Sequence, residues 1–268
     1  MRRKRGSSPP EHFKPTGMQL KRVFDDKYPN LEKVGWGPKL RKRFGYFTPD
    51  DQYEAIVEGI VTDRITWADI GCGRGMFGSN HRLARRLTQR AGYVLGMDPD
   101  PTIHENALLS EGVQCLVEEY TPDRLFDLIT LRMVAEHIEN PDRTVRSIST
   151  MLKKGGLVVL YTPHKWALLS ILARITPMSA HHFFKKILWK TEERDTFPVQ
   201  FKMNTRRVLV EVFARYGVEE MCYMVVDDCR VFQRYYVLNY IELSARRFFK
   251  FLRLQYPETC ILAVYGKS

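Results

Sequence analysis

The chain has 268 residues, of which 44% are hydrophobic and 27% are charged, an ordinary composition for a globular protein. No apolar run reaches the roughly 18 residues of a membrane-spanning helix, and the five cysteines include no C-x-x-C pair. These features exclude a spanning helix and argue against a disulfide framework or a zinc cluster. We therefore expect a cytoplasmic protein built around one large domain.

The net charge of +11 is concentrated near the N-terminus. Residues 1–43 hold 13 Lys and Arg against 4 Asp and Glu, whereas the remaining residues hold 29 against 27. This pattern predicts a basic, partly disordered N-terminal arm over 1–43, followed by one domain over 44–268. The arm either stays solvated or docks on anionic lipid or RNA. Nucleic acid is the less favoured partner, because the rest of the chain is nearly neutral.

Helices and strands are predicted to alternate from residue 50 onward. Thr48 offers a capping hydroxyl and Pro49 suits the first turn of a helix over 50–63. Strands are then expected over 65–70, 93–97, 113–117, 126–131, 157–161, 218–226 and 259–265. Helices are expected over 81–91, 102–110, 142–152, 166–190, 205–216 and 230–252. Strands joined through helices predict an α/β fold with a doubly wound, mostly parallel sheet.

The strongest motif is Asp69-Ile70-Gly71-Cys72-Gly73-Arg74-Gly75, between the first strand and the next helix. Glycines there let the backbone turn sharply and approach a ligand closely. A dinucleotide loop has the pattern G-x-G-x-x-G, but Met76 occupies the third glycine position, and the Asp69 carboxylate would repel a pyrophosphate. S-adenosylmethionine, which is cationic and carries no phosphate, fits this loop better than NAD.

A second acid, Asp98, ends the second strand, 29 residues after Asp69. A carboxylate at that place can accept both hydroxyl groups of a ribose. The alternative is that Asp98 only opens the turn that it begins with Pro99.

Four segments, WADIGCGRG, GMDPD, FDLITLRMVAEHI and LKKGGLVVLYTP, are together similar to class I S-adenosylmethionine-dependent methyltransferases. The similarity covers residues 45–165 and is strongest to the small-molecule group that includes quinone-biosynthesis O-methyltransferases. It implies a Rossmann-like, seven-stranded sheet with helical cap insertions over 166–204 and 230–253, flanking the sixth strand. It also implies methyl transfer from S-adenosylmethionine to a small-molecule or lipid-linked acceptor, with oxygen as the expected atom.

The same resemblance implies a set of cofactor-binding residues. The glycine loop would surround the methionine part, Asp98 would hold the ribose, and Val117 and Glu118 would lie beside the adenine. The full set is Asp69, Gly71, Cys72, Gly73, Gly75, Asp98, Pro99, Val117, Glu118, Arg132 and Met133. Met133 stands where quinone-type enzymes carry an acid, so we expect no metal site.

Three residues are candidates for a catalytic base. Glu136 and His137 follow the fourth strand, and His164 follows the fifth. Each could take a proton from an acceptor, but each could equally only order its loop.

The predicted cap helices leave the acceptor open. Either they cover the cleft, or they form an interfacial surface that brings the enzyme to a lipid-linked acceptor, as a peripheral contact at the inner face of a membrane. The alternatives to a small-molecule methyltransferase are an RNA methyltransferase that uses the basic arm and a non-catalytic scaffold that binds the cofactor.

Overall fold

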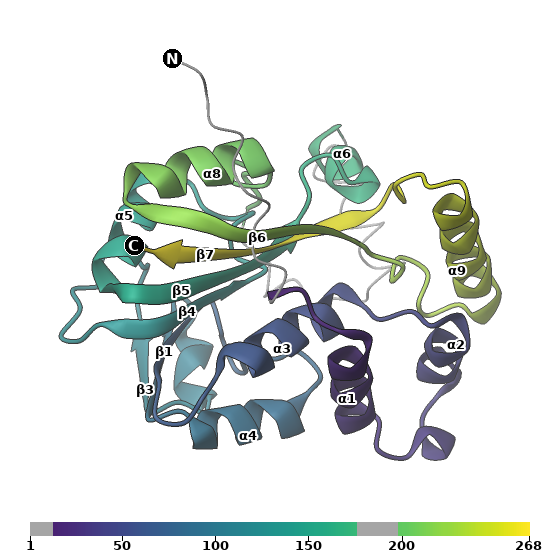
Figure 1. The fold of residues 1–268 in the computed structure, drawn as a ribbon, viewed down its shortest axis with the longest axis horizontal. Helices are drawn as coiled ribbons and strands as arrows, with labels where there is room; N and C mark the ends of the chain where they lie inside the picture. The colour runs from purple at the N-terminus through teal and green to yellow at the C-terminus, as the bar shows by residue number, and fades with distance from the viewer. Residues whose placement is uncertain (1–12, 176–197) are drawn as a thin grey trace.

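A seven-stranded sheet forms the centre of the computed structural model, which describes residues 13–175 and 198–268 (Figure 1). The strand order is β3-β2-β1-β4-β5-β7-β6. Strand β7 runs antiparallel to both of its neighbours, and the other pairs are parallel. The strands are β1 Thr66–Ile70, β2 Tyr93–Asp98, β3 Glu111–Gln114, β4 Phe126–Arg132, β5 Leu152–Pro163, β6 Val218–Asp227 and β7 Thr259–Lys267. The prediction of a mostly parallel, seven-stranded sheet is confirmed.

Helices cover both faces of this sheet. In Figure 1, α3 (Pro49–Ile60) and α4 (His81–Arg90) lie below it, and α5 (Pro141–Met151) and α8 (Arg206–Arg215) lie above it. Each face has its own apolar core. The remaining helices are α1 Gly17–Lys27, α2 Trp36–Phe44, α6 Leu168–Ile175 and α9 Tyr236–Phe251, with short 3₁₀ turns at Leu31–Lys33 and Pro101–Glu105.

The central strands are apolar throughout because both of their faces are buried. Along β5, Val158 and Leu160 belong to the core between the sheet and helices α5 and α8, whereas Val159 and Tyr161 belong to the core between the sheet and helices α3 and α4. Successive side chains of a strand point to opposite faces, so a strand covered on both sides needs a continuous apolar run.

Several element boundaries differ from the predicted ones. The predicted helix over 102–110 is only a 3₁₀ turn ending at Glu105, because the side chain of Asn106 accepts the backbone N–H of Leu108 and supports a turn there. Strand β3 begins and ends earlier than predicted, at Glu111–Gln114. Helix α9 begins at Tyr236 rather than at 230. The predicted helix over 166–190 is observed as Leu168–Ile175, and 176–190 lies outside the described residues.

The predicted basic arm over 1–43 contains α1 and most of α2, and both helices contact other helices of the domain. Thr16 caps α1 with a capping box, and Val23 and Phe24 are buried. The Nζ atom of Lys27 lies 2.8 Å from Asp51 and 2.9 Å from Glu54, both on α3. Charge composition alone suggested disorder, but apolar contacts and this buried ion pair anchor the segment to the domain.

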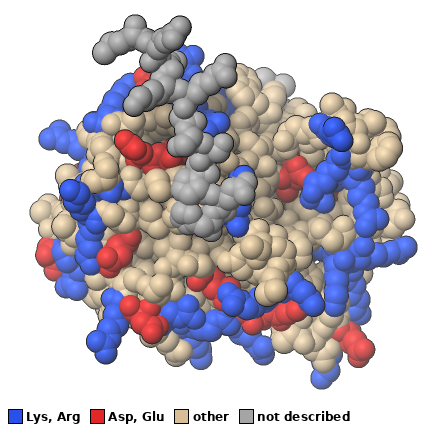
Figure 2. All heavy atoms as spheres, viewed as in Figure 1, with Lys and Arg blue, Asp and Glu red and all other residues tan. Residues whose placement is uncertain are grey.

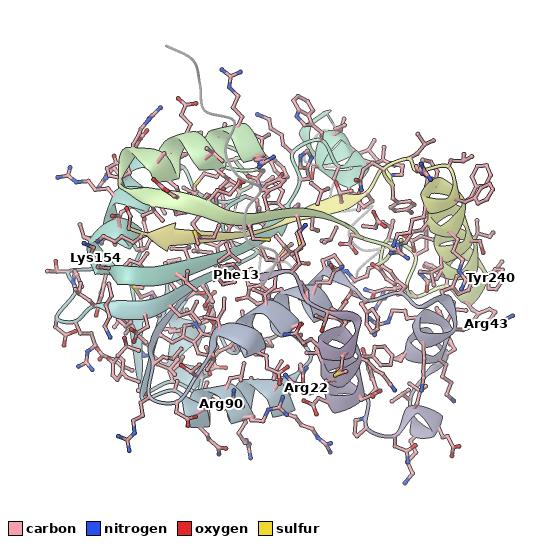
Figure 3. The ribbon with its side chains drawn as sticks, in the orientation of Figure 1. Phe13, Arg22, Arg43, Arg90, Lys154 and Tyr240 are labelled. Carbon is pink, nitrogen blue, oxygen red and sulfur yellow. The ribbon has the colours of Figure 1, made fainter. Side chains whose placement is uncertain are left out.

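Helix α2 packs in turn on α9. The rings of Phe44 and Tyr240 pack edge to face, with their centroids 5.3 Å apart. The guanidinium of Arg43 lies 6.0 Å from the centroid of the Tyr240 ring (Figure 3). Segments almost 200 residues apart in the sequence thus form one wall at the end of the sheet.

Replacing Lys27 with Met is expected to lower the free energy of unfolding by about 3 kcal/mol, because two buried carboxylates lose their common cation. Urea denaturation of the variant and of wild type measures the difference. Lys33→Met, on an exposed turn, is the matched control. Equal stability of the Lys27 variant and wild type would contradict the anchoring role of α1.

Candidate active site

A cavity of about 750 Å³ opens at the carboxyl ends of β1, β2 and β4. This is the edge at which open α/β sheets bind their ligands. All eleven residues predicted to bind the cofactor line it: Asp69, Gly71, Cys72, Gly73, Gly75, Asp98, Pro99, Val117, Glu118, Arg132 and Met133. The fold therefore brings the predicted set together, while the role of each residue toward a cofactor stays a prediction.

The glycine loop has backbone angles that favour glycine at two positions. Gly71 has φ +70° and Gly73 has φ +44°, in the left-handed region. A Cβ atom added at Gly71 would lie 2.2 Å from Cγ2 of Val134, so the loop and the segment after β4 are in close contact. At Gly75 an added Cβ would meet no atom within 4 Å. Glycine is thus required at Gly71 by both conformation and space, but not at Gly75.

Two backbone N–H groups orient the Asp98 carboxylate. Gly73 donates to Oδ2 at 2.8 Å and Asp100 donates to Oδ1 at 2.8 Å. Each oxygen keeps a further lone pair, so the carboxylate can still accept two hydroxyl groups, as a ribose would require. Burial raises the pKa of Asp98. Asp98 also opens the turn at Pro99, so the two alternatives of the sequence analysis are compatible.

Asp69 is buried at the end of β1 beneath the loop. The hydroxyl of Thr130 donates to its Oδ1 at 2.6 Å, and that hydroxyl accepts the indole N–H of Trp67 at 2.7 Å. Burial raises the pKa of Asp69 to about 7. A cation nearby would favour the ionised form of this carboxyl group, so its position suits a ligand with a positive charge. Together with Asp98 and the glycine loop, it fits S-adenosylmethionine.

The adenine side of the predicted site is formed by the segment after β3. Val117 is buried, and the Glu118 carboxylate accepts the hydroxyl of Thr144 on α5. Glu118 is thereby held at the wall of the cavity.

The next two residues of the predicted set lie at the end of β4: Arg132 is the last residue of the strand, and Met133 follows it. Met133 has φ +56°, an uncommon conformation for a residue other than glycine. The side chain of Arg132 reaches α3, where its Nε and Nη2 atoms both lie 3.0 Å from Oδ1 of Asp50. A second guanidinium, that of Arg230, contacts Oδ2 of the same carboxylate.

Asp50 thus joins two arginines from distant parts of the chain. Burial alone would raise the pKa of Asp50, but Arg230 and Arg132 hold it well below its usual range. Arg230 also binds Asp228 at 2.6 Å and the hydroxyl of Tyr161 at 2.8 Å. Sequence reasoning missed Asp50, Tyr161 and Arg230 as site residues. A signal for two of them was present in the sequence: Tyr161 lies near the carboxyl end of β5, and Arg230 follows shortly after the carboxyl end of β6.

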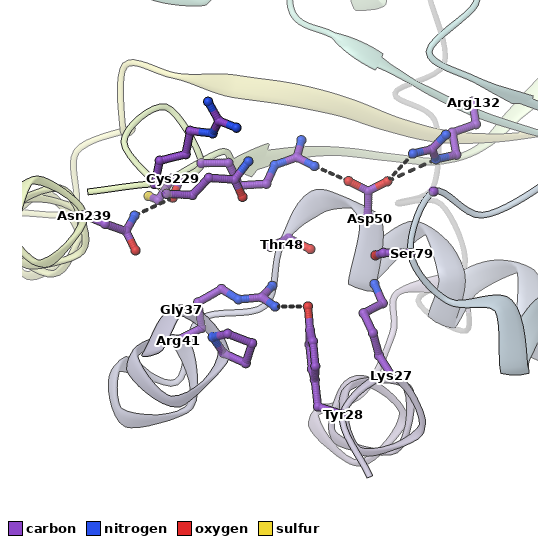
Figure 4. Close-up of a pocket in the computed structure, with 15 residues that line it drawn as sticks. Lys27, Tyr28, Gly37, Arg41, Thr48, Asp50, Ser79, Arg132, Cys229 and Asn239 are labelled. Carbon is purple, nitrogen blue, oxygen red and sulfur yellow. Dashed lines mark hydrogen bonds and ion pairs between the residues drawn. The ribbon is translucent and has the colours of Figure 1, made fainter. Parts of the chain in front are cut away.

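A second cavity, of about 560 Å³, is lined by Asp50, Arg132 and Arg230 of this ion-pair cluster (Figure 4). Arg132 lines both cavities. The other lining residues are Lys27, Tyr28, Gly37, Pro38, Arg41, Thr48, Asp50, Gly78, Ser79, Cys229, Arg230, Gln233, Arg234 and Asn239.

The three candidate bases occupy different environments. His137 lines the first cavity, and its Nδ1 atom lies 3.2 Å from the carbonyl oxygen of Pro198. Glu136 is buried behind it and accepts the hydroxyl of Thr162 at 2.8 Å, and burial raises its pKa. His164 lines neither cavity, and its Nδ1 accepts the backbone N–H of Trp166 at 3.2 Å. The structure therefore brings His137, but not His164, to the predicted cofactor residues.

Comparisons with known proteins agree with this geometry. A family model described as a methyltransferase domain matches residues 39–217. The ubiquinone biosynthesis O-methyltransferase of Aeromonas salmonicida is 30% identical over 165 residues, which cover 53% of this chain and 68% of that protein. The protein of the same name from Stutzerimonas stutzeri is 28% identical over 137 residues, 44% of this chain and 56% of that protein. The chain thus spans between about half and two thirds of the length of these curated relatives.

Solved structures show the same fold. A putative sarcosine dimethylglycine methyltransferase from Galdieria sulphuraria aligns with TM-score 0.50 and 12% identity, over 82% of this chain and 85% of that chain. Geranyl diphosphate C-methyltransferase from Streptomyces coelicolor aligns with TM-score 0.50 and 17% identity, over 81% and 77% of the two chains.

Replacing Gly71 with Ala is expected to destabilise the protein by at least about 2 kcal/mol, since the new methyl group adds strain at positive φ and overlaps Val134. Gly75→Ala, in the same loop, is the matched control and should stay within about 0.5 kcal/mol of wild type. Thermal or urea unfolding without ligand measures both. Equal effects of the two substitutions would contradict the described loop geometry.

Proposed function

The chain belongs to the class I S-adenosylmethionine-dependent methyltransferases, and we propose that it methylates a small-molecule acceptor at an oxygen atom. The observation that carries the proposal is the cavity in which the glycine loop, Asp69 and Asp98 meet. The names of the curated relatives support oxygen as the methylated atom.

When bound, S-adenosylmethionine supplies a methyl group activated by a sulfonium. In our proposal, Gly71 and Gly73 admit the methionine part, and Asp69 beneath them offers negative charge to its cationic groups. Asp98 accepts the ribose hydroxyls, and Val117 and Glu118 flank the adenine. The protein mainly has to align the acceptor and keep water out, because the cofactor brings the reactive group.

We propose His137 as the group that takes the proton from the acceptor hydroxyl. If its Nδ1–H donates to the carbonyl of Pro198, then Nε2 is left as the basic atom. Glu136 lies 4.0 Å from that Nε2 atom and is tied to Thr162, so we assign it a positioning role. His164 would then serve to order the turn at Trp166.

The activity is tested by incubating the protein with methyl-labelled S-adenosylmethionine and an extract of its own organism, followed by separation into lipid, RNA, protein and small-molecule fractions. We expect label in the small-molecule or lipid fraction. The Asp98→Ala variant should bind S-adenosylmethionine at least about tenfold more weakly, about 1.4 kcal/mol, because a charge-assisted acceptor is lost.

Two outcomes would contradict the proposal. Label confined to RNA would favour the RNA methyltransferase alternative. Unchanged cofactor affinity in Asp98→Ala would show that the cofactor binds elsewhere. Loss of labelling in His137→Ala with unchanged cofactor affinity is the result expected of a base.

We also propose peripheral contact with an anionic membrane through α9. None of the described helices is both long and apolar enough to cross a membrane. Helix α9 nevertheless exposes Val237, Ile241, Phe248 and Phe251, whose spacing places them on one face. Exposed Lys and Arg lie on α2 and on or just after α9: Lys42, Arg43, Arg247, Lys250 and Arg253. Figure 2 shows Lys and Arg gathered on the side of the molecule where α2 and α9 lie. Apolar side chains flanked by basic ones are typical of interfacial helices.

Cosedimentation with vesicles of phosphatidylcholine and phosphatidylglycerol tests this contact. The double variant Phe248→Ser, Phe251→Ser should bind at least about tenfold more weakly, because two large apolar side chains no longer enter the interface. Val210→Ser, at an exposed apolar position of α8, is the control. Unchanged sedimentation of the double variant would contradict the assignment of α9.

A further inference from the structure

The second cavity lies at the part of the sheet edge that the predicted cofactor residues leave open. The first cavity is formed at the ends of β1, β2 and β4, whereas the second is reached by Arg132 from β4 and by Cys229 and Arg230 directly after β6. Arg132 belongs to both walls, so the two cavities adjoin at this residue. A molecule in the second cavity would therefore lie next to a ligand in the first.

The second cavity has an excess of positive charge. Among the described residues, one carboxylate, that of Asp50, and five cationic side chains line it: Lys27, Arg41, Arg132, Arg230 and Arg234. Within the same part of the chain, four carboxylates are bound to these five cations: Asp50, Asp51, Glu54 and Asp228.

Some of the cations keep donors for a ligand. Arg41 donates from Nη1 to Asp51 at 3.2 Å and from Nη2 to the hydroxyl of Tyr28 at 2.7 Å, and a guanidinium has five N–H groups (Figure 4). Arg234 is exposed at the rim and forms no ion pair within the part of the chain that the structure describes. Arg230, by contrast, is already bound to Asp50, Asp228 and Tyr161.

The rest of the wall is polar rather than apolar. Hydroxyl and amide groups come from Thr48, Ser79, Gln233 and Asn239, and an aliphatic side chain comes from Pro38. Such a wall suits a ligand with hydroxyl groups and does not offer a slot for a hydrocarbon chain. If the acceptor carries such a chain, it must lie outside this cavity.

We propose that the second cavity is the acceptor site of the methyl transfer proposed above, and that it takes a polar acceptor carrying a phosphate or carboxylate group. Arg41 and Arg234 bind the anionic group from the side of α2 and α9. Arg132, held by Asp50, lines both cavities, and the acceptor hydroxyl would extend past it to reach His137, which lines only the first cavity. The assignment of this cavity to the acceptor rests on the proposed function. The preference for an anionic group rests only on the residues that line the cavity.

Calorimetric titration of the full chain with glycerol 3-phosphate and with gluconate tests the proposal, with glycerol as the neutral comparison. Wild type should bind at least one of the anions and not glycerol. Arg41→Gln and Arg234→Gln should each weaken anion binding by about fivefold, as expected for a partly solvated charged hydrogen bond. Arg82→Gln, at an exposed position of α4 outside both cavities, is the control.

Separate measurement of S-adenosylmethionine binding distinguishes failure of this inference from failure of the proposed function. Both glutamine variants should keep wild-type cofactor affinity, and saturating cofactor should leave anion binding intact. Displacement of the anion by the cofactor would overturn the inference, since the cavity would then belong to the cofactor. Equal anion binding by wild type, Arg41→Gln and Arg234→Gln would also overturn the inference. Arg234→Gln is expected to fold normally, because Arg234 is exposed.

Vesicles containing phosphatidic acid identify the source of the anionic group. Binding that is weakened by Arg234→Gln more than by Arg82→Gln would support a lipid headgroup as the ligand. Binding of glycerol 3-phosphate or gluconate without such an effect on vesicles would support a free small molecule. Absence of binding to both the soluble anions and the vesicles would overturn the proposal.

Discussion

The buried carboxylate of Asp50 connects most of the parts that form the site. It comes from the first turn of α3 and is bound by Arg132 from the end of β4 and by Arg230 from the segment after β6. A buried charge is tolerated only when it is paired and hydrogen-bonded, so the three elements must meet in one arrangement. That arrangement places Arg132 where two cavities at the same edge of the sheet adjoin.

The same constraint explains why the N-terminal helices belong to the domain. Lys27 and Arg41 both bind Asp51, which is the neighbour of Asp50 on α3. Helix α2 then packs on α9 through Phe44 and Tyr240. Two cations of this basic region, Lys27 and Arg41, line the second cavity, and in our proposal their charge favours an anionic ligand there.

The two cavities differ in the charge of the side chains that line them. The first offers carboxylates, at Asp69 and Asp98, to a ligand with cationic groups and a ribose. The second offers arginines and hydroxyl groups. Opposite electrostatic preferences on the two sides of Arg132 would keep each ligand in its own cavity, because each would be repelled or left without partners in the other.

The sequence by itself determined the sheet, the glycine loop and the acids at the ends of β1 and β2. These features depend on local patterns: apolar runs for strands covered on both faces, glycines where φ is positive, and acids at fixed places along neighbouring strands. Loop, Asp69 and Asp98 come from consecutive βα units, so their proximity follows from the order of elements along the chain.

Only the tertiary structure decided the second cavity and the place of the N-terminal helices. Asp50, Arg132 and Arg230 are separated by 82 and by 98 residues, and nothing local to any of them indicates the other two. In the sequence, Asp50 follows a capping threonine and so looks like a residue of an ordinary helix start, and Lys27 looks like part of a solvated basic segment. Their roles arise from pairing across elements, which depends on burial and distance, and neither quantity can be obtained from the charge of a residue or from its neighbours along the chain.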